Sequence, residues 1–286
     1  MVLFEGAAAT TLLPRLLPLL DGARTADALA ALLGVPAAAV EHALRALATR
    51  RLLWDGPPQP GLSPALRETV EQLAADAELP PSLVGERLAA ASIAVVGSSR
   101  AARVAAALIA EAGVAVVRPG RWRDARAELV LAAPGRAEAG ALRRLNRRAL
   151  RRGTTWLPML PYDGRIAIAG PLVVPGETAC FTCYRLRRAA ASGYGEELLA
   201  LDRAAVAAAS SATIERLAAE LAVLHALRWL GTRDARLPGM LQSVELADGA
   251  VVERHAVLRV PRCPACSGLG ELAPPLPWFD LPLEKA

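Results

Sequence analysis

The residues best suited to chemistry in this sequence are its four cysteines, which form two Cys-x-x-Cys pairs. The first pair is Cys180 and Cys183, and the second is Cys263 and Cys266. Each pair can present two thiolates to one ion, and two pairs complete the tetrahedral set that a structural zinc ion takes. Four thiolates leave no open position for water, so the predicted zinc is structural. A thioredoxin-like redox pair is the competing interpretation, but it does not account for the second pair.

A strand that runs into a glycine and then a helix invites a nucleotide-binding interpretation. The fingerprint needs Gly-x-Gly-x-x-Gly, so that the backbone can approach phosphate at the helix N-terminus. Residues 97–102 read Gly-Ser-Ser-Arg-Ala-Ala, and the next predicted strand ends in Arg118 instead of the acid that would bind ribose. The only lysine is Lys285. We therefore predict a Rossmann-like fold with no nucleotide, no cofactor-binding residues and no catalytic residues.

The elements that must position the cysteines indicate an α/β domain over residues 91–286. A buried strand at 92–97, a helix at 100–112 and a strand at 114–117 form a β-α-β unit. The later predicted elements are a strand at 129–132, an arginine-rich helix at 138–152, a loop-rich stretch after Cys183, a helix at 211–230, and a hairpin whose strands, 244–246 and 251–260, flank Asp248-Gly249.

The residues before this domain predict a smaller module. A leucine stripe over 12–20 indicates a helix, Thr25 is a suitable N-cap for a short second helix, and 36–50 has amphipathic helical spacing. Apolar, strand-like segments at 2–4 and 52–54 flank these helices, so residues 1–56 read as a winged helix-turn-helix. Residues 57–90 read as a linker with a helix that begins after Ser63.

Composition favours a cytoplasmic protein. No stretch reaches the roughly 18 uncharged apolar residues of a membrane span, and the N-terminus lacks the basic region of a signal peptide. The net charge is +5, which could favour nucleic acid, a membrane or an acidic peptide. The abundance of Ala, Arg, Gly and Pro offers a plainer explanation, so we expect no membrane partner and disfavour nucleic acid.

Segment 170–184 reads GPLVVPGETACFTCY, and it is followed by Arg187 and by Arg-Cys-Pro-Ala-Cys at 262–266. This pattern resembles the ThiF-like proteins of azole- and azoline-forming ribosomal peptide biosynthesis, which are relatives of the ThiF and MoeB fold and partner YcaO cyclodehydratases. Segment 16–25, LLPLLDGART, also resembles the winged-helix module with which such proteins recognise a precursor's leader peptide.

The resemblance implies a non-catalytic scaffold that binds the leader and presents it to a YcaO cyclodehydratase, with homodimerisation left open. In such relatives the leader adds a strand beside the third strand and third helix of the winged-helix module. Carried over here, that strand is 2–4 and the helix is 36–50. The implied peptide-binding residues are Val2, Leu3, Phe4, Val40 and Leu44.

One departure from the family concerns this module. Two further strands normally precede the one at 2–4, so we expect either that the start of this sequence is truncated or that the recognition module is incomplete. Two alternative functions are weighed against the scaffold. An ATP-dependent adenylating enzyme of the ThiF type is disfavoured by the glycine-poor loop and the missing lysine. A DNA-binding regulator is disfavoured because alanines 37–39 begin the helix that would read the major groove.

Overall fold

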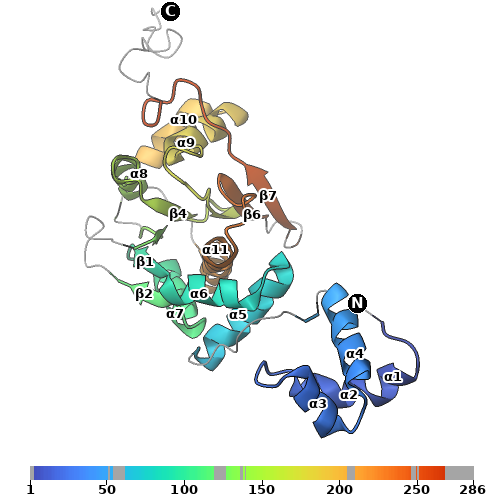
Figure 1. Cartoon of the computed structure of the whole chain (residues 1–286). Coiled ribbons are helices and arrows are strands. Elements are labelled where there is room, and N and C mark those ends of the chain that lie inside the picture. Colours follow the sequence, from blue (N-terminus) through green and yellow to red (C-terminus); the bar gives the residue numbers. More distant parts are fainter. Residues whose placement is uncertain are drawn as a thin grey trace, which may run out of the picture. The chain divides into compact units, whose positions relative to one another are not determined.

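The computed structural model describes residues 3–50, 52–53, 62–118, 127–135, 138, 140–204, 210–245, 249 and 251–267, leaving aside the side chains of 201–204. The chain divides into two compact units, 1–89 and 90–286, which are described separately (Figure 1). The helices of the first unit are α1 (Ala7–Thr11), α2 (Leu13–Leu16), the 3-10 helix η1 (Leu17–Leu19), α3 (Ala26–Leu33), α4 (Ala37–Thr49), α5 (Pro64–Ala77) and α6 (Pro81–Ala90).

A small hydrophobic core, which begins at Leu12, holds α2 to α4 of the first unit together. The Thr25 hydroxyl caps α3 by accepting a hydrogen bond from the Ala28 N–H, and Gly34 ends the helix at a φ of 66°. The chain then bends by 119° into α4. The buried members of the core are Leu12, Leu16, Leu29, Ala30, Leu33, Val40 and Ala43.

The described part of the first unit is helical, and this differs from the expected winged helix. Leu3, Phe4, Leu52 and Leu53 belong to no strand, whereas Val2 and Trp54 lie outside the described residues. A strand is stable only when its backbone groups form hydrogen bonds with a neighbouring strand. The two described apolar residues at each end of the helices form no such pairing. The linker helix follows the prediction: the Ser63 hydroxyl accepts the Leu66 N–H at the start of α5.

The second unit is built on one seven-stranded mixed sheet of order β2-β1-β3-β4-β5-β6-β7. The strands β2, β1, β3 and β4 are parallel, and β4 to β7 are antiparallel. The strands are β1 (Ser92–Val96), β2 (Ala115–Val117), β3 (Leu129–Ala132), β4 (Thr155–Leu160), β5 (Ile166–Ala169), β6 (Met240–Glu245) and β7 (Val251–Ala256). The helices are α7 (Arg100–Glu111), α8 (Ala141–Arg152), α9 (Phe181–Ala191), α10 (Gly195–Ala204) and α11 (Ala212–Thr232).

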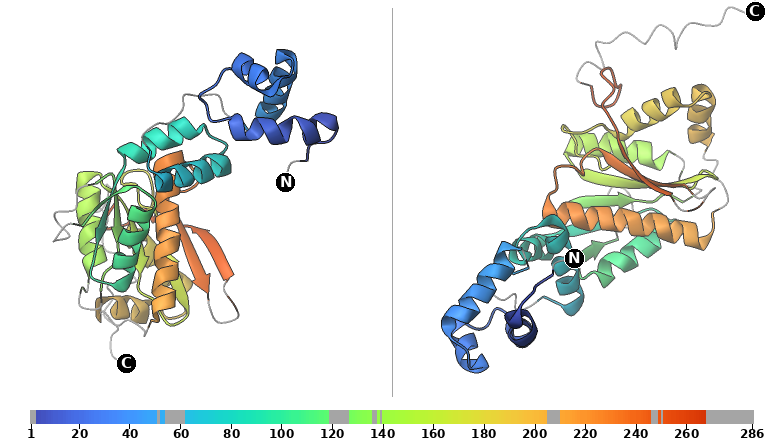
Figure 2. Two further views of the ribbon diagram at one scale, coloured as in Figure 1. Left: turned by 90° about the horizontal axis from the view of Figure 1, so that it is seen from below. Right: turned by 90° about the vertical axis from the view of Figure 1, so that its right-hand side faces the viewer.

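Helices cover both faces of this sheet. Helices α7 and α11 pack against each other on one face, and α8 packs on the other, as the left view of Figure 2 shows. The parallel strands β1 and β3 are buried almost throughout, which explains why they read as continuous apolar runs. The mixed α/β architecture agrees with the predicted fold class.

Two expectations for this unit need correction. The stretch after Cys183 was expected to be rich in loops, but it forms α9 and α10. The expected helix at 138–152 begins only at Ala141, so Glu138 precedes it.

The expected hairpin is present as the antiparallel pair β6 and β7. Asp248, in the turn of this hairpin, lies outside the described residues.

No single helix among the described residues is long and apolar enough to cross a membrane. The pair α3 and α4 passes a test of length and composition when taken together, although it is bent at the intervening break. Its buried residues belong to the core of the first unit.

Candidate metal centre

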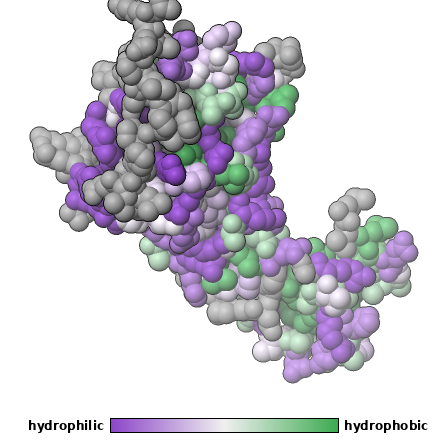
Figure 3. Space-filling view, turned by 90° about the horizontal axis from the view of Figure 1, so that it is seen from above, coloured by the Kyte–Doolittle hydropathy of each residue, from purple (hydrophilic) through white to green (hydrophobic). Residues whose placement is uncertain are grey.

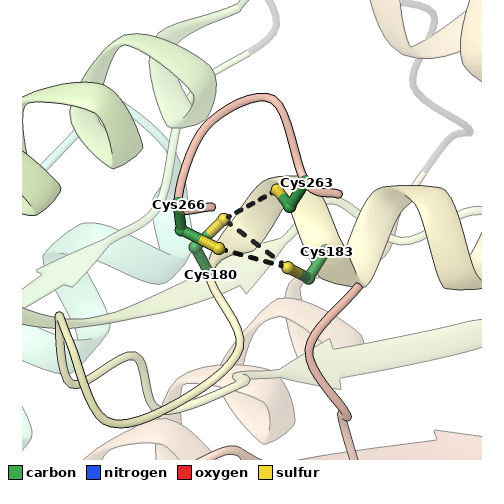
Figure 4. A group of neighbouring side chains, drawn as sticks. All are labelled: Cys180, Cys183, Cys263 and Cys266. Carbon is green, nitrogen blue, oxygen red and sulfur yellow. Dashed lines mark hydrogen bonds between the residues drawn. The ribbon is translucent and has the colours of Figure 1, made fainter. Parts of the chain in front are cut away.

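The two cysteine pairs come together in the second unit, as the sequence predicts. The ligand sulfurs of all four residues lie within 4.8 Å of one another, and Figure 4 shows them converging on one point. The sulfur–sulfur distances are 3.9 Å for Cys180–Cys183, 3.7 Å for Cys180–Cys263 and 3.5 Å for Cys183–Cys266. Disulfide sulfurs would lie about 2.05 Å apart, so the four are free thiols. Sulfurs at about 2.3 Å from one tetrahedral zinc would be about 3.8 Å apart.

The sheet and a short turn position the first pair. Trp156 of β4 exchanges two backbone hydrogen bonds with Val173, at 3.0 and 2.8 Å. The chain then turns between Val174 and Thr178, whose hydroxyl accepts the Val174 N–H. This turn delivers Cys180 to the N-cap of α9 and Cys183 to its first turn. Residues three apart on a helix share a face, so both sulfurs point to the same side.

A buried asparagine holds the start of α9. The Asn146 side chain, on the covered face of α8, accepts the Phe181 N–H at 3.0 Å and donates to the Thr182 hydroxyl at 3.3 Å. Sequence reasoning missed this residue. The available signal was its place in α8: Asn146 lies four residues after Leu142 and three before Ala149, on the apolar face of an otherwise arginine-rich helix.

Two arginines tether the segment that carries the second pair. Arg187 of α9 donates to the Leu258 and Arg259 carbonyls at 2.7 and 2.8 Å. Arg259 donates in return to the Thr178 and Gly176 carbonyls at 2.9 and 2.5 Å. The segment therefore bonds to both sides of the first pair before it reaches Cys263.

The buried position of the sulfurs shapes their ionisation. Sulfur–sulfur hydrogen bonds with Cys183 and Cys263 lower the pKa of Cys180 far below its usual range. Hydrogen bonds with Cys180 and Cys183 raise the pKa of Cys263. Burial raises the pKa of Cys266 to about 12. Ionisation of Cys263 and Cys266 is therefore unfavourable without a cation, whereas a metal ion among the sulfurs would stabilise thiolates. The backbone N–H of Val260 also points to the Cys183 sulfur, at 3.4 Å. This set of donors fits a soft divalent metal.

The expected peptide-binding residues differ in how far the structure buries them. Leu3 is 71% exposed, and the Phe4 ring lies 4.8 Å beneath the Arg50 guanidinium at the end of α4. Val40 is fully buried in the core of the first unit, and Leu44 is half-buried at its edge. Val2 lies outside the described residues.

Comparison with known proteins rests on structure. No family model matches the chain, and no curated protein matches it in sequence. A heterocyclase solved in complex with substrate and cofactor matches 91% of this chain at a TM-score of 0.66 and 20% identity, and the match covers 35% of that protein. The heterocyclase TruD matches 88% at a TM-score of 0.65 and 24% identity, covering 38% of TruD.

A third match is to a protein that is shorter than the two heterocyclases. The Escherichia coli protein MccB, solved with ATP, matches 85% of this chain at a TM-score of 0.59 and 14% identity, and the match covers 86% of MccB. The chain thus spans little more than a third of the heterocyclases and most of MccB. At these identities the likeness is one of fold: the chain has the α/β architecture found in these heterocyclases and in MccB.

Proposed function

We propose that the chain is a non-catalytic scaffold that binds the leader of a ribosomal precursor peptide and presents it to a YcaO cyclodehydratase for azoline or azole formation. The observation that carries this proposal is the fit of nine-tenths of the chain to a heterocyclase fold. The segment 170–184, which resembles the ThiF-like partners of such enzymes, supports it because that segment builds the turn and helix start around Cys180.

The proposed cofactor is one structural zinc ion held by the four cysteines. Sulfur distances of 3.5 to 3.9 Å support this choice, as does a donor set made only of thiols. Cys180, Cys183 and Cys263 are fully buried. A closed and buried site of this kind would fasten the returning segment to α9 without exposing the metal to substrate.

The lack of a phosphate-binding glycine loop supports the non-catalytic part of the proposal. Only Gly97 of the expected three glycines is present, and the single lysine of the chain is Lys285. Gly97 has a φ of 115°, and a Cβ at this position would lie 1.9 Å from the Ala133 carbonyl oxygen. The glycine thus allows close packing of β1 against the segment after β3.

The first unit is the proposed leader-binding module. Leu3, Leu17 and Leu32 are all at least half exposed, and Figure 3 shows hydrophobic residues among hydrophilic ones at the surface. We propose that some of these exposed apolar side chains of the first unit contact the leader. The exposed Leu3, the Phe4–Arg50 contact and the half-buried Leu44 support a proposed groove beside α4. We assign the fully buried Val40 to the support of this groove.

Direct binding tests the proposal. A fluorescein-labelled leader peptide, taken from a precursor encoded beside this gene, should raise its fluorescence polarisation when the purified chain is added. Phe4→Asp or Leu44→Asp should weaken binding at least tenfold, because burial of one large apolar side chain contributes roughly 1.5–3 kcal/mol. Leu224→Asp, at an exposed leucine on α11 of the second unit, is the matched control. Binding only in the presence of the YcaO partner, or equal affinity in all variants, would contradict the scaffold.

An adenylating enzyme is the second candidate, because the match to MccB covers most of both chains. The two candidates separate in one assay. An adenylating enzyme would release pyrophosphate from ATP in the presence of a precursor peptide, whereas the scaffold would release none without its YcaO partner.

A further inference from the structure

The strand order of the second unit creates a crevice where ligands usually bind in this type of sheet. From β1 the chain crosses to β2 on one side and then to β3 on the other, so the topology reverses between β1 and β3. In open parallel sheets the carboxyl ends of the strands at such a switch point form the ligand site, and phosphate binds at the following helix N-terminus. The loop at 97–99, between β1 and α7, lies at this edge.

A carboxylate of the chain itself binds the loop that precedes α7. Oxygen Oε2 of Glu138, just before α8, accepts the Ser98 N–H at 3.0 Å and the Ser98 hydroxyl at 3.0 Å. The same oxygen accepts the Gly135 N–H at 2.6 Å. The three donors come from the loop after β1 and the loop after β3, so this side chain joins the two walls of the crevice.

The crevice is also closed beneath this contact. The Ser99 hydroxyl donates to the Ala133 carbonyl at 2.9 Å, and the Ala133 N–H donates to the Val96 carbonyl at 2.9 Å. A Cβ on Gly135 would lie 2.3 Å from the Ser98 hydroxyl oxygen. The loop after β1 and the loop after β3 are therefore in direct contact beneath Glu138.

We propose that Glu138 is a built-in anion that excludes nucleotide phosphates from the switch point between β1 and β3. A bound phosphate would compete for the Ser98 and Gly135 donors and would meet a like charge at hydrogen-bond distance. The contact replaces the ligand that normally bridges the two loops. This inference concerns the second unit alone and holds whether or not the first unit binds a leader.

Removal of the carboxylate should open the site to anions. In differential scanning fluorimetry of the full chain, inorganic phosphate or ATP should leave the melting temperature of the wild type unchanged. In Glu138→Ala, phosphate at about ten times its dissociation constant should raise the melting temperature by about 3 °C. Glu138→Gln, which keeps an accepting oxygen, should show a smaller rise. Glu111→Gln, a charge loss at the other end of α7, should behave as the wild type.

Two results would overturn the proposal. The first is saturable binding of ATP to the wild type in equilibrium dialysis, with an affinity equal to that of Glu138→Ala. The second is a set of Glu138 variants that respond to phosphate no more than the wild type does. If Glu138→Ala does not fold, Glu138→Gln and wild-type dialysis decide the matter.

Discussion

Loss of one metal ligand should destabilise the second unit strongly, and Cys263→Ser is the sharpest such change. Cys263 is fully buried, and its sulfur lies 3.7 Å from that of Cys180, 83 residues earlier in the chain. A serine hydroxyl is a poor zinc ligand at neutral pH because it stays protonated. The variant therefore removes the proposed metal link between distant segments. It leaves the buried thiols of Cys180 and Cys183 and the partly buried thiol of Cys266 without a shared cation.

The size of the effect follows from metal binding to the folded chain. A metal ion that binds only the folded state, at about 1,000 times its dissociation constant, stabilises that state by about 4.1 kcal/mol. One kcal/mol shifts the melting temperature of a unit of this size by about 2–4 °C. Cys263→Ser should therefore lower the melting temperature by on the order of 10–15 °C, and a strong chelator should do the same to the wild type.

Calorimetry together with zinc quantification checks this expectation. The wild type should contain about one zinc per chain, and Cys263→Ser should contain much less. Ala265→Ser is the matched control, since it adds a hydroxyl between Cys263 and Cys266 and removes no ligand. Zinc well below one ion per chain in a fully stable wild type would refute the reasoning, as would an unchanged melting temperature in Cys263→Ser.

Two further predictions concern the packing of the second unit. Arg259→Ala should lower the free energy of unfolding by about 1 kcal/mol in urea titration, because it removes bonds to the Thr178 and Gly176 carbonyls; the exposed Arg254→Ala should have little effect. Burial lowers the pKa of His225 from 6.5 to about 4. As the pH falls, His225 is therefore protonated in the unfolded chain at a higher pH than in the folded chain. Stability should therefore be constant above about pH 6.5 and decline toward pH 4, and His225→Leu, compared at each pH, should lack this part of the decline.

The sequence was most informative where one physical signal dominated a segment. Arg100–Glu111 follows a serine whose hydroxyl caps the helix by accepting the Ala102 N–H, so its start was predictable to the residue. Strand β4 was missed because Pro158 interrupts it, and proline is disfavoured in central strands. Helix α9 was missed because Cys180 and Cys183 were interpreted only as metal ligands, although their spacing also suits one helix face.

In the candidate site too, local sequence patterns predicted some contacts, whereas others depend on tertiary packing. The spacing within each Cys-x-x-Cys pair predicted the four-sulfur cluster, because few other uses of buried thiols require two such pairs. No local pattern links Asn146 to the Phe181 N–H, or Glu138 to Ser98, because these contacts depend on how α8 and its preceding loop pack. The strand expected at 2–4 depended on partners that the described residues of the first unit do not supply.

The distance along the chain between the cysteine pairs also sets an order of events during synthesis. With 83 residues between matching positions of the two pairs, and roughly 5–20 residues added per second, the ribosome makes the second pair about 4–16 s after the first. During that interval the nascent chain offers two sulfurs, too few to enclose a metal ion. Tight metal uptake therefore distinguishes chains translated through Cys266 from shorter fragments.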